Sequence, residues 1–381
     1  MATVSKPTQM ALKWVMGILL GLFFIWLSAL DWPINRIVGE PLSWHGSVVQ
    51  CGEHWSFDTF YLLPYFLILV AIHFLRVIRW KPLLEPLGEV DFRTLNSVSA
   101  IGFMYLFVLP FRLGELVRPY LLSRHTRIGM SESMATIVVE RVVDGLIVSV
   151  ILLAVLVGMP AAESLETEEA RTALSTIEWG AIVALSAFGG AFTLLVVAYW
   201  ARAWTIRILK ATIGRISTGL AGKIIGVIEE FFRGLRVLPN VQCFAVFLAW
   251  SMLYWLLNGL GYFVLALGFA QLTVSPLAAY AMMCWLIVGM MLPNPPANVG
   301  VFWYFLLMPL VVFGVDSQQN TAALVFGLMA WLGQLVQQGA FGLWFQIRAR
   351  RFPLVKSAQT HANTRPDSSP TAQMGERVET T

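Results

Sequence analysis

Residues 112–119 read Arg-Leu-Gly-Glu-Leu-Val-Arg-Pro and bring three charges into an otherwise apolar part of the chain. They follow mostly apolar sequence at 94–109 and precede an apolar run at 133–158. Only 13% of the 381 residues are charged, about half of the roughly 25% typical of a soluble domain. The cluster of Arg112, Glu115 and Arg118 therefore indicates a working site inside a membrane protein.

The apolar runs around this cluster predict a helical protein that crosses a membrane several times. Hydrophobic residues make up 57% of the chain and the mean hydropathy is +0.71. A helix needs about 20 apolar residues to cross a hydrocarbon core of roughly 30 Å. Two stretches, 94–111 and 275–315, are apolar but shorter or broken. Six runs are long enough, and we expect spanning helices at 10–30, 57–78, 133–158, 177–200, 241–268 and 319–346.

The distribution of charge predicts the orientation of these helices. Lys and Arg gather at 76–93, 202–236 and 348–365, whereas 31–58 and 159–178 are mainly acidic. Basic loops stay on the cytoplasmic side of a membrane, which places both termini in the cytoplasm of a multi-pass protein of the cell inner membrane. The same asymmetry makes nucleic acid an unexpected partner.

The remaining chemistry-bearing residues predict no cofactor and no metal. Cys51, Cys243 and Cys284 form no disulfide framework, and we expect Cys51 in an outer loop. The sequence Cys-Gly-Glu-His at 51–54 has too few ligands for zinc. Residues 347–381 are expected to form a disordered cytoplasmic tail.

The two broken stretches predict re-entrant hairpins. If 94–111 crossed completely, the following arginines would lie outside and the helix at 133–158 would run in the wrong direction. We therefore expect 94–127 to enter from the cytoplasm, break between Pro110 and Gly114, and return. The stretch 275–315 breaks at Pro-Asn-Pro-Pro-Ala-Asn-Val-Gly, residues 293–300, and is expected to return to the outer side.

The resulting order predicts two halves of opposite orientation. Residues 1–158 and 159–346 each hold two spanning helices, a hairpin and a third spanning helix, which is the inverted-repeat architecture of many transporters. A basic linker at 201–240 joins the halves and is expected to lie as an amphipathic helix on the inner leaflet. Eight ordinary spanning helices are the alternative.

The charges predict a site for an anion. Irregular backbone inside a membrane must line protein or a wet cavity. Gly114 would allow a close backbone approach, and both return helices would point their positive N-terminal ends inward. Arginine binds phosphate through two parallel hydrogen bonds. The expected headgroup-binding residues are Arg112, Gly114, Glu115, Arg118, Glu140, Arg141 and Asp144, with Pro293, Asn294, Pro296, Asn298 and Gly300 in the second hairpin.

Glu140, Arg141 and Asp144 lie in the third expected span. Glu140 and Asp144 are four residues apart and share a helix face, while Arg141 and Asp144 can pair at a spacing of three. Each would cost about 2.5–3.5 kcal/mol if buried without a partner. We expect them to close a network with Arg112, Glu115 and Arg118; a purely structural ion-pair cluster is the alternative.

The motifs Arg112-x-Gly-Glu-x-x-Arg-Pro119-Tyr-Leu and Glu140-Arg-x-x-Asp144, followed by a Pro-rich turn that ends in Gly300, resemble the transmembrane region of the lysylphosphatidylglycerol synthase family. The resemblance covers roughly residues 10–346. It implies a flippase-like membrane protein that moves a lipid between leaflets. The synthase activity of the full family members is not implied, because it resides in a separate soluble domain.

Three functions remain open at this point. The first is a lipid translocase for an anionic phospholipid or a polyprenyl-phosphate-linked lipid, with no enzyme activity. The second is a non-catalytic membrane partner that positions a lipid-modifying enzyme or a glycosyltransferase. The third is an intramembrane enzyme that uses His73 or His125, although neither has a recognisable nucleophile or metal partner by spacing.

Overall fold

The computed structural model describes residues 15, 19, 22, 40–213, 218–292, 295–315 and 320–351, with the side chains of 110–111, 209–213, 218–224 and 349–351 left out. The expected first span at 10–30 therefore lies almost wholly outside the described residues. The same holds for Pro293 and Asn294 and for the expected tail from residue 352 onward.

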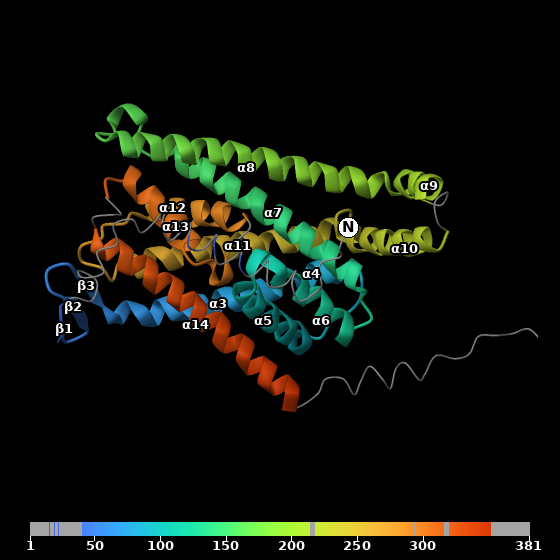
Figure 1. Cartoon of the computed structure of the whole chain (residues 1–381), viewed down its shortest axis with the longest axis horizontal. Helices are drawn as coiled ribbons and strands as arrows, with labels where there is room; N and C mark the ends of the chain where they lie inside the picture. Colours follow the sequence, from blue (N-terminus) through green and yellow to red (C-terminus); the bar gives the residue numbers. More distant parts are fainter. Residues whose placement is uncertain are drawn as a thin grey trace, which may run out of the picture.

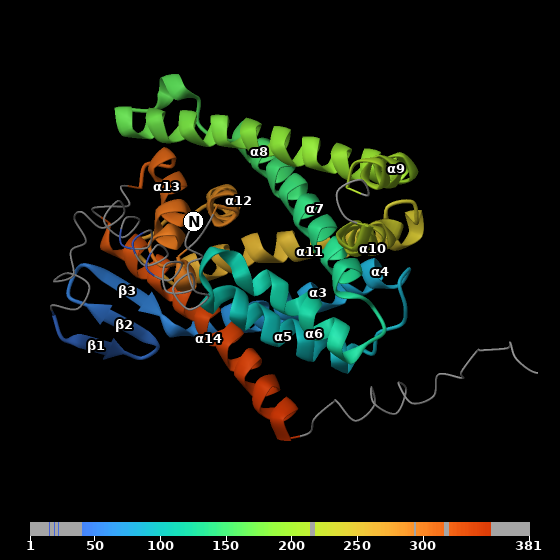
Figure 2. The same ribbon diagram turned by 45° about the vertical axis from the view of Figure 1, so that its right-hand side comes forward.

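Long helices dominate the part of the chain that the structure describes (Figure 1). Four of them are long and apolar enough to cross a membrane, and they coincide with four of the predicted spans. Within the bundle, α8 lies along one side and α14 along the opposite side (Figure 2). These four helices are α3 (Leu62–Ile78), α8 (Glu168–Trp200), α11 (Val241–Ala266) and α14 (Thr321–Arg351).

A fifth long helix, α7 (Met130–Val157), matches the span predicted at 133–158. Its 28 residues extend over about 42 Å at 1.5 Å per residue. Three charged residues, Glu140, Arg141 and Asp144, interrupt its otherwise apolar sequence. Glu140 and Asp144 are fully buried, so α7 carries its charges on the face that packs inside the protein.

Two further units consist of a helix, a 3-10 turn and a second helix, and they occupy the two stretches predicted to break. In each unit the two helices pack against each other, and the two turns contact one another. The second helix of the first unit begins at Val117. The units are α5 (Phe92–Val108), η2 (Pro110–Leu116) and α6 (Val117–His125), then α12 (Pro276–Met290), η5 (Pro296–Asn298) and α13 (Val301–Val312).

A three-stranded antiparallel sheet precedes α3, where the sequence predicted only an acidic outer loop. The register pairs His45 with Val48 and Cys51 with Trp55. Cys51 is buried in the second strand, which corrects its expected place in a loop. The sheet is tied to the end of α11, because Asp58 N–H donates to Gly268 O at 2.8 Å. The strands are β1 (Leu42–His45), β2 (Val48–Cys51) and β3 (Trp55–Asp58).

Three of the shorter helices, α4, α9 and α10, lie at the end of the molecule opposite the sheet (Figure 1). The predicted linker forms two helices rather than one. The second, α10, packs along α7, and Arg233 Nε donates to Glu132 Oε1 at 2.6 Å. The short helices are α4 (Lys81–Leu84), η1 (Thr59–Tyr61), η3 (Ala162–Ser164), α9 (Arg202–Ile213), α10 (Thr218–Gly234) and η4 (Leu235–Val237).

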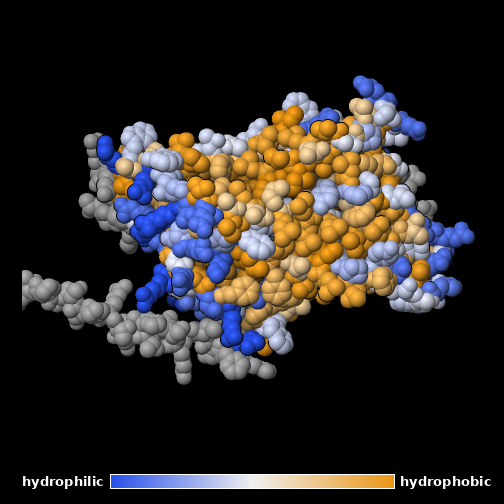
Figure 3. Space-filling model, turned by 180° about the vertical axis from the view of Figure 1, so that it is seen from behind, coloured by the Kyte–Doolittle hydropathy of each residue, from blue (hydrophilic) through white to orange (hydrophobic). Residues whose placement is uncertain are grey.

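The surface is divided as a bilayer requires. One face shows a broad band of apolar side chains across the middle, with hydrophilic residues toward the two ends (Figure 3). Exposed apolar residues on the spanning helices include Ile182, Leu194 and Leu256. Because the band coincides with helices long enough to cross a hydrocarbon core, the protein is a multi-pass membrane protein.

Candidate functional site

A buried ion-pair cluster joins α3, α6 and α7. Arg79, at the end of α3, is fully buried and donates from Nη2 to Glu140 Oε1 at 2.9 Å and to Asp144 Oδ2 at 2.8 Å. Its Nη1 also bonds Asp144 Oδ1. A planar guanidinium can serve two carboxylates at once because its donors form a fixed fork. Arg79 thus lies at the centre of the cluster.

The two carboxylates of α7 have further partners. Glu140 accepts from Arg118 Nη1 at 3.2 Å through Oε2 and from Arg141 Nη2 at 2.8 Å through Oε1. Asp144 accepts from the indole of Trp255 at 3.0 Å and lies 3.7 Å from Arg141 Nη2. The predicted pairing along this helix face is therefore confirmed. Each carboxylate is surrounded by donors, which removes the cost of burying it unpaired.

Arg118 is held by packing as well as by charge. Its guanidinium lies over the rings of Trp80 and Phe103, at 4.1 Å and 4.9 Å from their centroids. Its stem passes over Gly102, where a Cβ atom would stand 2.2 Å from Arg118 Cγ. Arg118 is only 3% exposed, so this side chain belongs to the structural cluster and not to an open binding surface.

Arg112 and Glu115 form a separate pair, contrary to the predicted single network. Arg112 Nη2 lies 2.7 Å from Glu115 Oε1, and Arg112 Nη1 donates to Met290 O at 3.1 Å. Within the described residues Arg112 forms no ion pair with Glu140 or Asp144, and Glu115 forms none with Arg118 or Arg141. The physical reason is that Arg79, which enters from α3, occupies the acceptors that the sequence assigned to Arg112. The bond to Met290 connects the first break to the end of α12.

Both breaks hold strained backbone. Among the described residues, the non-glycine residues with positive φ are Arg112 at 57°, Ala297 at 55° and Asn298 at 55°. All three lie in the 3-10 turns of the two broken units. Such conformations are costly for residues with a Cβ and cluster at functional sites. The turns contact each other, so the strain is concentrated at one place in the molecule.

Gly114 allows the first break to fold back on its own helix. A Cβ atom at this position would lie 2.2 Å from Leu106 N and 2.3 Å from the carbonyl carbon of Tyr105. Only a residue without a Cβ can bring two backbone segments this close. The close approach predicted for Gly114 is thus confirmed. In the second break Gly300 has φ of 80° and directly precedes α13.

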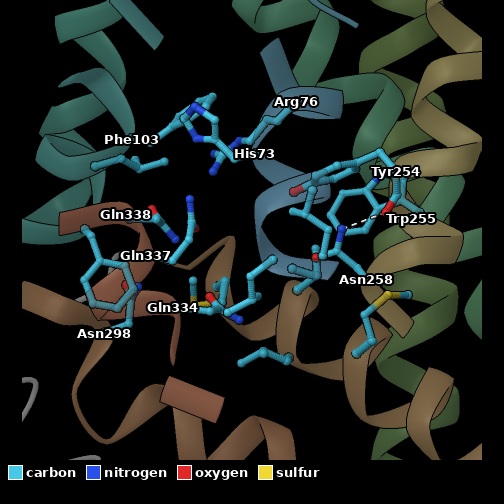
Figure 4. A pocket seen from close by; sticks show the side chains of 18 of the residues that line it. His73, Arg76, Phe103, Tyr254, Trp255, Asn258, Asn298, Gln334, Gln337 and Gln338 are labelled. Carbon is cyan, nitrogen blue, oxygen red and sulfur yellow. Dashed lines mark hydrogen bonds between the residues drawn. The ribbon is translucent and has the colours of Figure 1, made fainter. Parts of the chain in front are cut away.

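A cavity of about 130 Å³ lies between α3, α5, α11, α12 and α14 and beside both breaks. Three arginines line it: Arg76 from α3, Arg112 from the first break and Arg141 from α7. None of the described residues in its wall is an aspartate or a glutamate. Figure 4 shows His73 and Arg76 on one side of this space and Gln334, Gln337 and Gln338 on another. The cavity therefore presents cationic and neutral polar groups together.

Arg76 is distinct among these arginines. It forms no ion pair in the described part of the chain, and its guanidinium lies 3.8 Å from the centroid of Phe103. Its Nε is buried without a hydrogen-bond partner. Arg112 and Arg141, by contrast, already pair with carboxylates. Counting the cluster and the cavity together, five arginines face three carboxylates, which leaves an excess of two positive charges.

The predicted site residues divide into three groups. Arg112, Arg141 and Asn298 line the cavity, whereas Arg118, Glu140 and Asp144 belong to the buried cluster beside it. Gly114 and Glu115 line a small space next to Arg118. The first residues of α6 and α13 are not in the cavity wall, so the predicted inward-pointing helix ends do not line it. Pro296 and Gly300 shape the second break without lining the cavity.

Two important residues escaped the sequence interpretation. Arg76 and Arg79 were assigned to the basic loop at 76–93 that ends the second span. The spacing His73, Arg76, Arg79 places all three close together on one helix face, and this pattern could have indicated that they point inward.

His73 is buried, and its Nε2 lies 3.0 Å from Asn96 Oδ1, while His125 Nδ1 lies 2.7 Å from Leu121 O. In the described part of the chain, no group of three or more His, Cys, Asp or Glu side chains is placed to hold a metal ion.

Comparison with known proteins supplies one match. The family model described as the lysylphosphatidylglycerol synthase TM region matches residues 14–336. Neither the curated proteins nor the solved structures gave a significant match. Since the matched range covers most of the chain and contains both broken units and most of the residues that line the cavity, this protein belongs to the lysylphosphatidylglycerol synthase TM region family.

Proposed function

We propose that this protein moves a lipid with an anionic, phosphate-bearing headgroup between the leaflets of the cell inner membrane, without acting as an enzyme. The lipid is an anionic phospholipid or a polyprenyl-phosphate-linked lipid. One observation carries the proposal: the cavity contains three arginines and no carboxylate among its described wall residues. Uncompensated charge inside a membrane protein is expensive and marks a path for substrate or ions.

In the proposed mechanism the phosphate replaces water around Arg76 and approaches Arg112 and Arg141. Arg76 supplies the free cation, because it has no ion pair in the described structure. Arginine can hold a phosphate through two parallel charge-assisted hydrogen bonds. The neighbouring cluster of Arg79, Glu140 and Asp144 keeps α3 and α7 in register and so positions Arg76 and Arg141.

The two broken units act as re-entrant hairpins of an inverted repeat in this proposal. Each would enter from one side of the membrane, turn near the midplane and return. Positive φ at Arg112 and Asn298 and the bond from Arg112 to Met290 O support a shared role for the turns. A small change at this contact would open the cavity toward one leaflet or the other. Both termini are placed in the cytoplasm on the basis of the basic loops.

The variant Arg76→Gln tests the proposal. The protein is reconstituted in vesicles of phosphatidylcholine that contain a trace of headgroup-intact, tail-labelled phosphatidylglycerol, and loss of label to an external quencher reports its movement. Wild-type protein should accelerate movement and Arg76→Gln should abolish the acceleration. Replacing Arg76 breaks no ion pair in the described structure, so the midpoint of thermal unfolding in detergent should stay close to that of the wild type.

Arg93→Gln is the matched control, because Arg93 is exposed at the start of α5 and lies outside the cavity. This variant should move lipid at the wild-type rate. Normal movement by folded Arg76→Gln would overturn the assignment of the phosphate to this cavity. A wild-type protein that moves no lipid, but purifies with a bound lipid-modifying enzyme or glycosyltransferase, would instead support the role of a membrane partner.

A further inference from the structure

We infer that the headgroup taken up by this cavity carries, next to its phosphate, an uncharged and hydroxyl-rich group such as glycerol, inositol or a sugar, and not an amine. This inference rests on the proposed function and specifies its substrate class. It follows from two features of the cavity: the absence of a free carboxylate in its described wall and the presence of a wall of neutral amides.

The carboxylates that could bind an amine are already used. Glu140 is bonded to Arg79, Arg118 and Arg141, and Glu115 lies against Arg112. Asp144 is bonded to Arg79 and to the Trp255 indole. None of the three lines the cavity. An ammonium group placed there would face three arginines and no carboxylate, and like charges at close range in a low-dielectric site repel strongly.

The amide wall provides what a hydroxyl group needs. A hydroxyl both donates and accepts, and a side-chain amide offers two donors and an acceptor. Gln334, Gln337 and Gln338 stand three and four residues apart on α14, so they share one face. Asn258 of α11 and Asn298 of the second break complete the polar wall.

Gln337 has the strongest need for a ligand. Its side chain is 8% exposed, and its Nε2 is buried without a hydrogen-bond partner in the described structure. A buried amide that lacks a partner is unfavourable unless a bound group supplies one. The side chain points into the space opposite Arg76 (Figure 4). Phosphate at the arginines and a polyol at the glutamines would thus fill the two sides of the cavity.

The test compares four tail-labelled lipids in otherwise identical vesicles that contain the full-length protein. These are phosphatidylglycerol, phosphatidylinositol, phosphatidic acid and lysylphosphatidylglycerol. Phosphatidylglycerol and phosphatidylinositol should move fastest, with lysylphosphatidylglycerol at least about tenfold slower. Phosphatidic acid should lie between them, because it offers phosphate without the polyol.

Two variants of the same residue sharpen the comparison. Gln337→Leu should lower the rate of phosphatidylglycerol movement by about threefold to tenfold, the loss expected for one hydrogen bond. The rate of phosphatidic acid movement should stay unchanged. Gln337→Glu should raise the rate of lysylphosphatidylglycerol relative to phosphatidylglycerol, because it adds a carboxylate that an amine can bind. Gln346→Leu on the same helix is the control, since Gln346 bonds Tyr105 outside the cavity.

The outcomes separate the inference from the function on which it rests. Equal rates for lysylphosphatidylglycerol and phosphatidylglycerol would overturn the inference and leave the translocase intact. Equal rates for phosphatidic acid and phosphatidylglycerol, unaffected by Gln337→Leu, would also overturn it, because the polyol would then contribute nothing. Failure of the wild-type protein to move any of the four lipids would overturn the proposed function together with the inference.

Discussion

Arg79 shows how one side chain can organise a membrane protein. It is fully buried and bonds both Glu140 and Asp144 of α7 while its own backbone ends α3. Its guanidinium also lies 4.3 Å from the centroid of the Tyr254 ring of α11. Three helices therefore meet at this group. Lysine could not replace it, because an ammonium lacks the planar fork that reaches both carboxylates.

The first prediction concerns this residue. Arg79→Leu leaves Glu140 and Asp144 with fewer cations in a fully buried site, and removing one partner of a buried ion pair typically costs about 3–5 kcal/mol. We expect a large fall in the midpoint of thermal unfolding, measured in detergent by intrinsic tryptophan fluorescence. Arg171→Leu is the control, because its pair with Glu168 is solvent-exposed and worth about 0–1 kcal/mol. Similar shifts for the two variants would contradict the central role of Arg79.

The second prediction separates function from stability at Arg112. This residue has φ of 57°, a conformation that costs about 1–2 kcal/mol for a residue with a Cβ. Arg112→Gly relieves that strain while losing the half-buried pair with Glu115, so the unfolding midpoint should stay near the wild-type value. Lipid movement should be lost. A glycine variant that moves lipid normally would show that Arg112 only anchors the first break to Met290.

The sequence predicted the charged residues of α7 well and those of α3 poorly, for a physical reason. Glu140, Arg141 and Asp144 stand inside a long apolar run, where charge is conspicuous. Arg76 and Arg79 stand at the end of such a run, where basic residues normally flank a span. The inward direction of Arg79 depends on contacts with residues more than 60 positions away, and that of Arg76 on Phe103 of another helix. Periodicity alone could not supply those contacts.

At the scale of single elements, the first break depends on Gly114. The third prediction concerns Gly114→Ala. The added Cβ would lie 2.2 Å from the Leu106 backbone nitrogen, so η2 must move away from α5. We expect lower thermal stability and loss of lipid movement, measured on the same purified sample. Gly190→Ala in α8 is the control, because nothing lies within 4 Å of its Cβ position and alanine favours a helix by about 1 kcal/mol. A Gly114→Ala protein as stable and active as Gly190→Ala would show that the close approach is dispensable.

The helices were predictable because long apolar runs mark them. The two breaks were predictable because proline and glycine interrupt a helix. Runs of apolar residues located α3, α7, α8, α11 and α14, and proline with glycine located the two breaks. The sheet before α3 was missed, although Gly46 and Gly52 both have the positive φ of hairpin turns. Each strand has four residues. That is too few for the alternation of apolar and polar residues to be recognised beside charged residues. The strain at Ala297 and Asn298 had no sequence signal of its own.

At the scale of the whole molecule, the long helices α3, α7, α8 and α11 run between the end with the sheet and the end with α4 and α10 (Figure 1). The first broken unit has both of its outer ends near α4 and α7, and the second connects to the sheet end through α11 and α14. The cavity lies where the two breaks meet. The orientation of both broken units in a membrane is a separate physical property that can be measured.

The last prediction concerns that orientation. Single cysteines are introduced at the exposed positions Glu89, Arg127, Glu163 and Thr273 and are labelled in intact cells with a membrane-impermeant maleimide. If α5 and α6 enter and return on one side, Glu89→Cys and Arg127→Cys should be protected together, because both ends of the unit face the cytoplasm. Glu163→Cys and Thr273→Cys should be labelled, since α7 and α11 each cross once more. Permeabilised cells, in which all four must react, control for access. Opposite labelling of Glu89→Cys and Arg127→Cys would mean that the first broken unit crosses completely, and then the cavity could not face both leaflets in turn as the proposed movement of lipid requires.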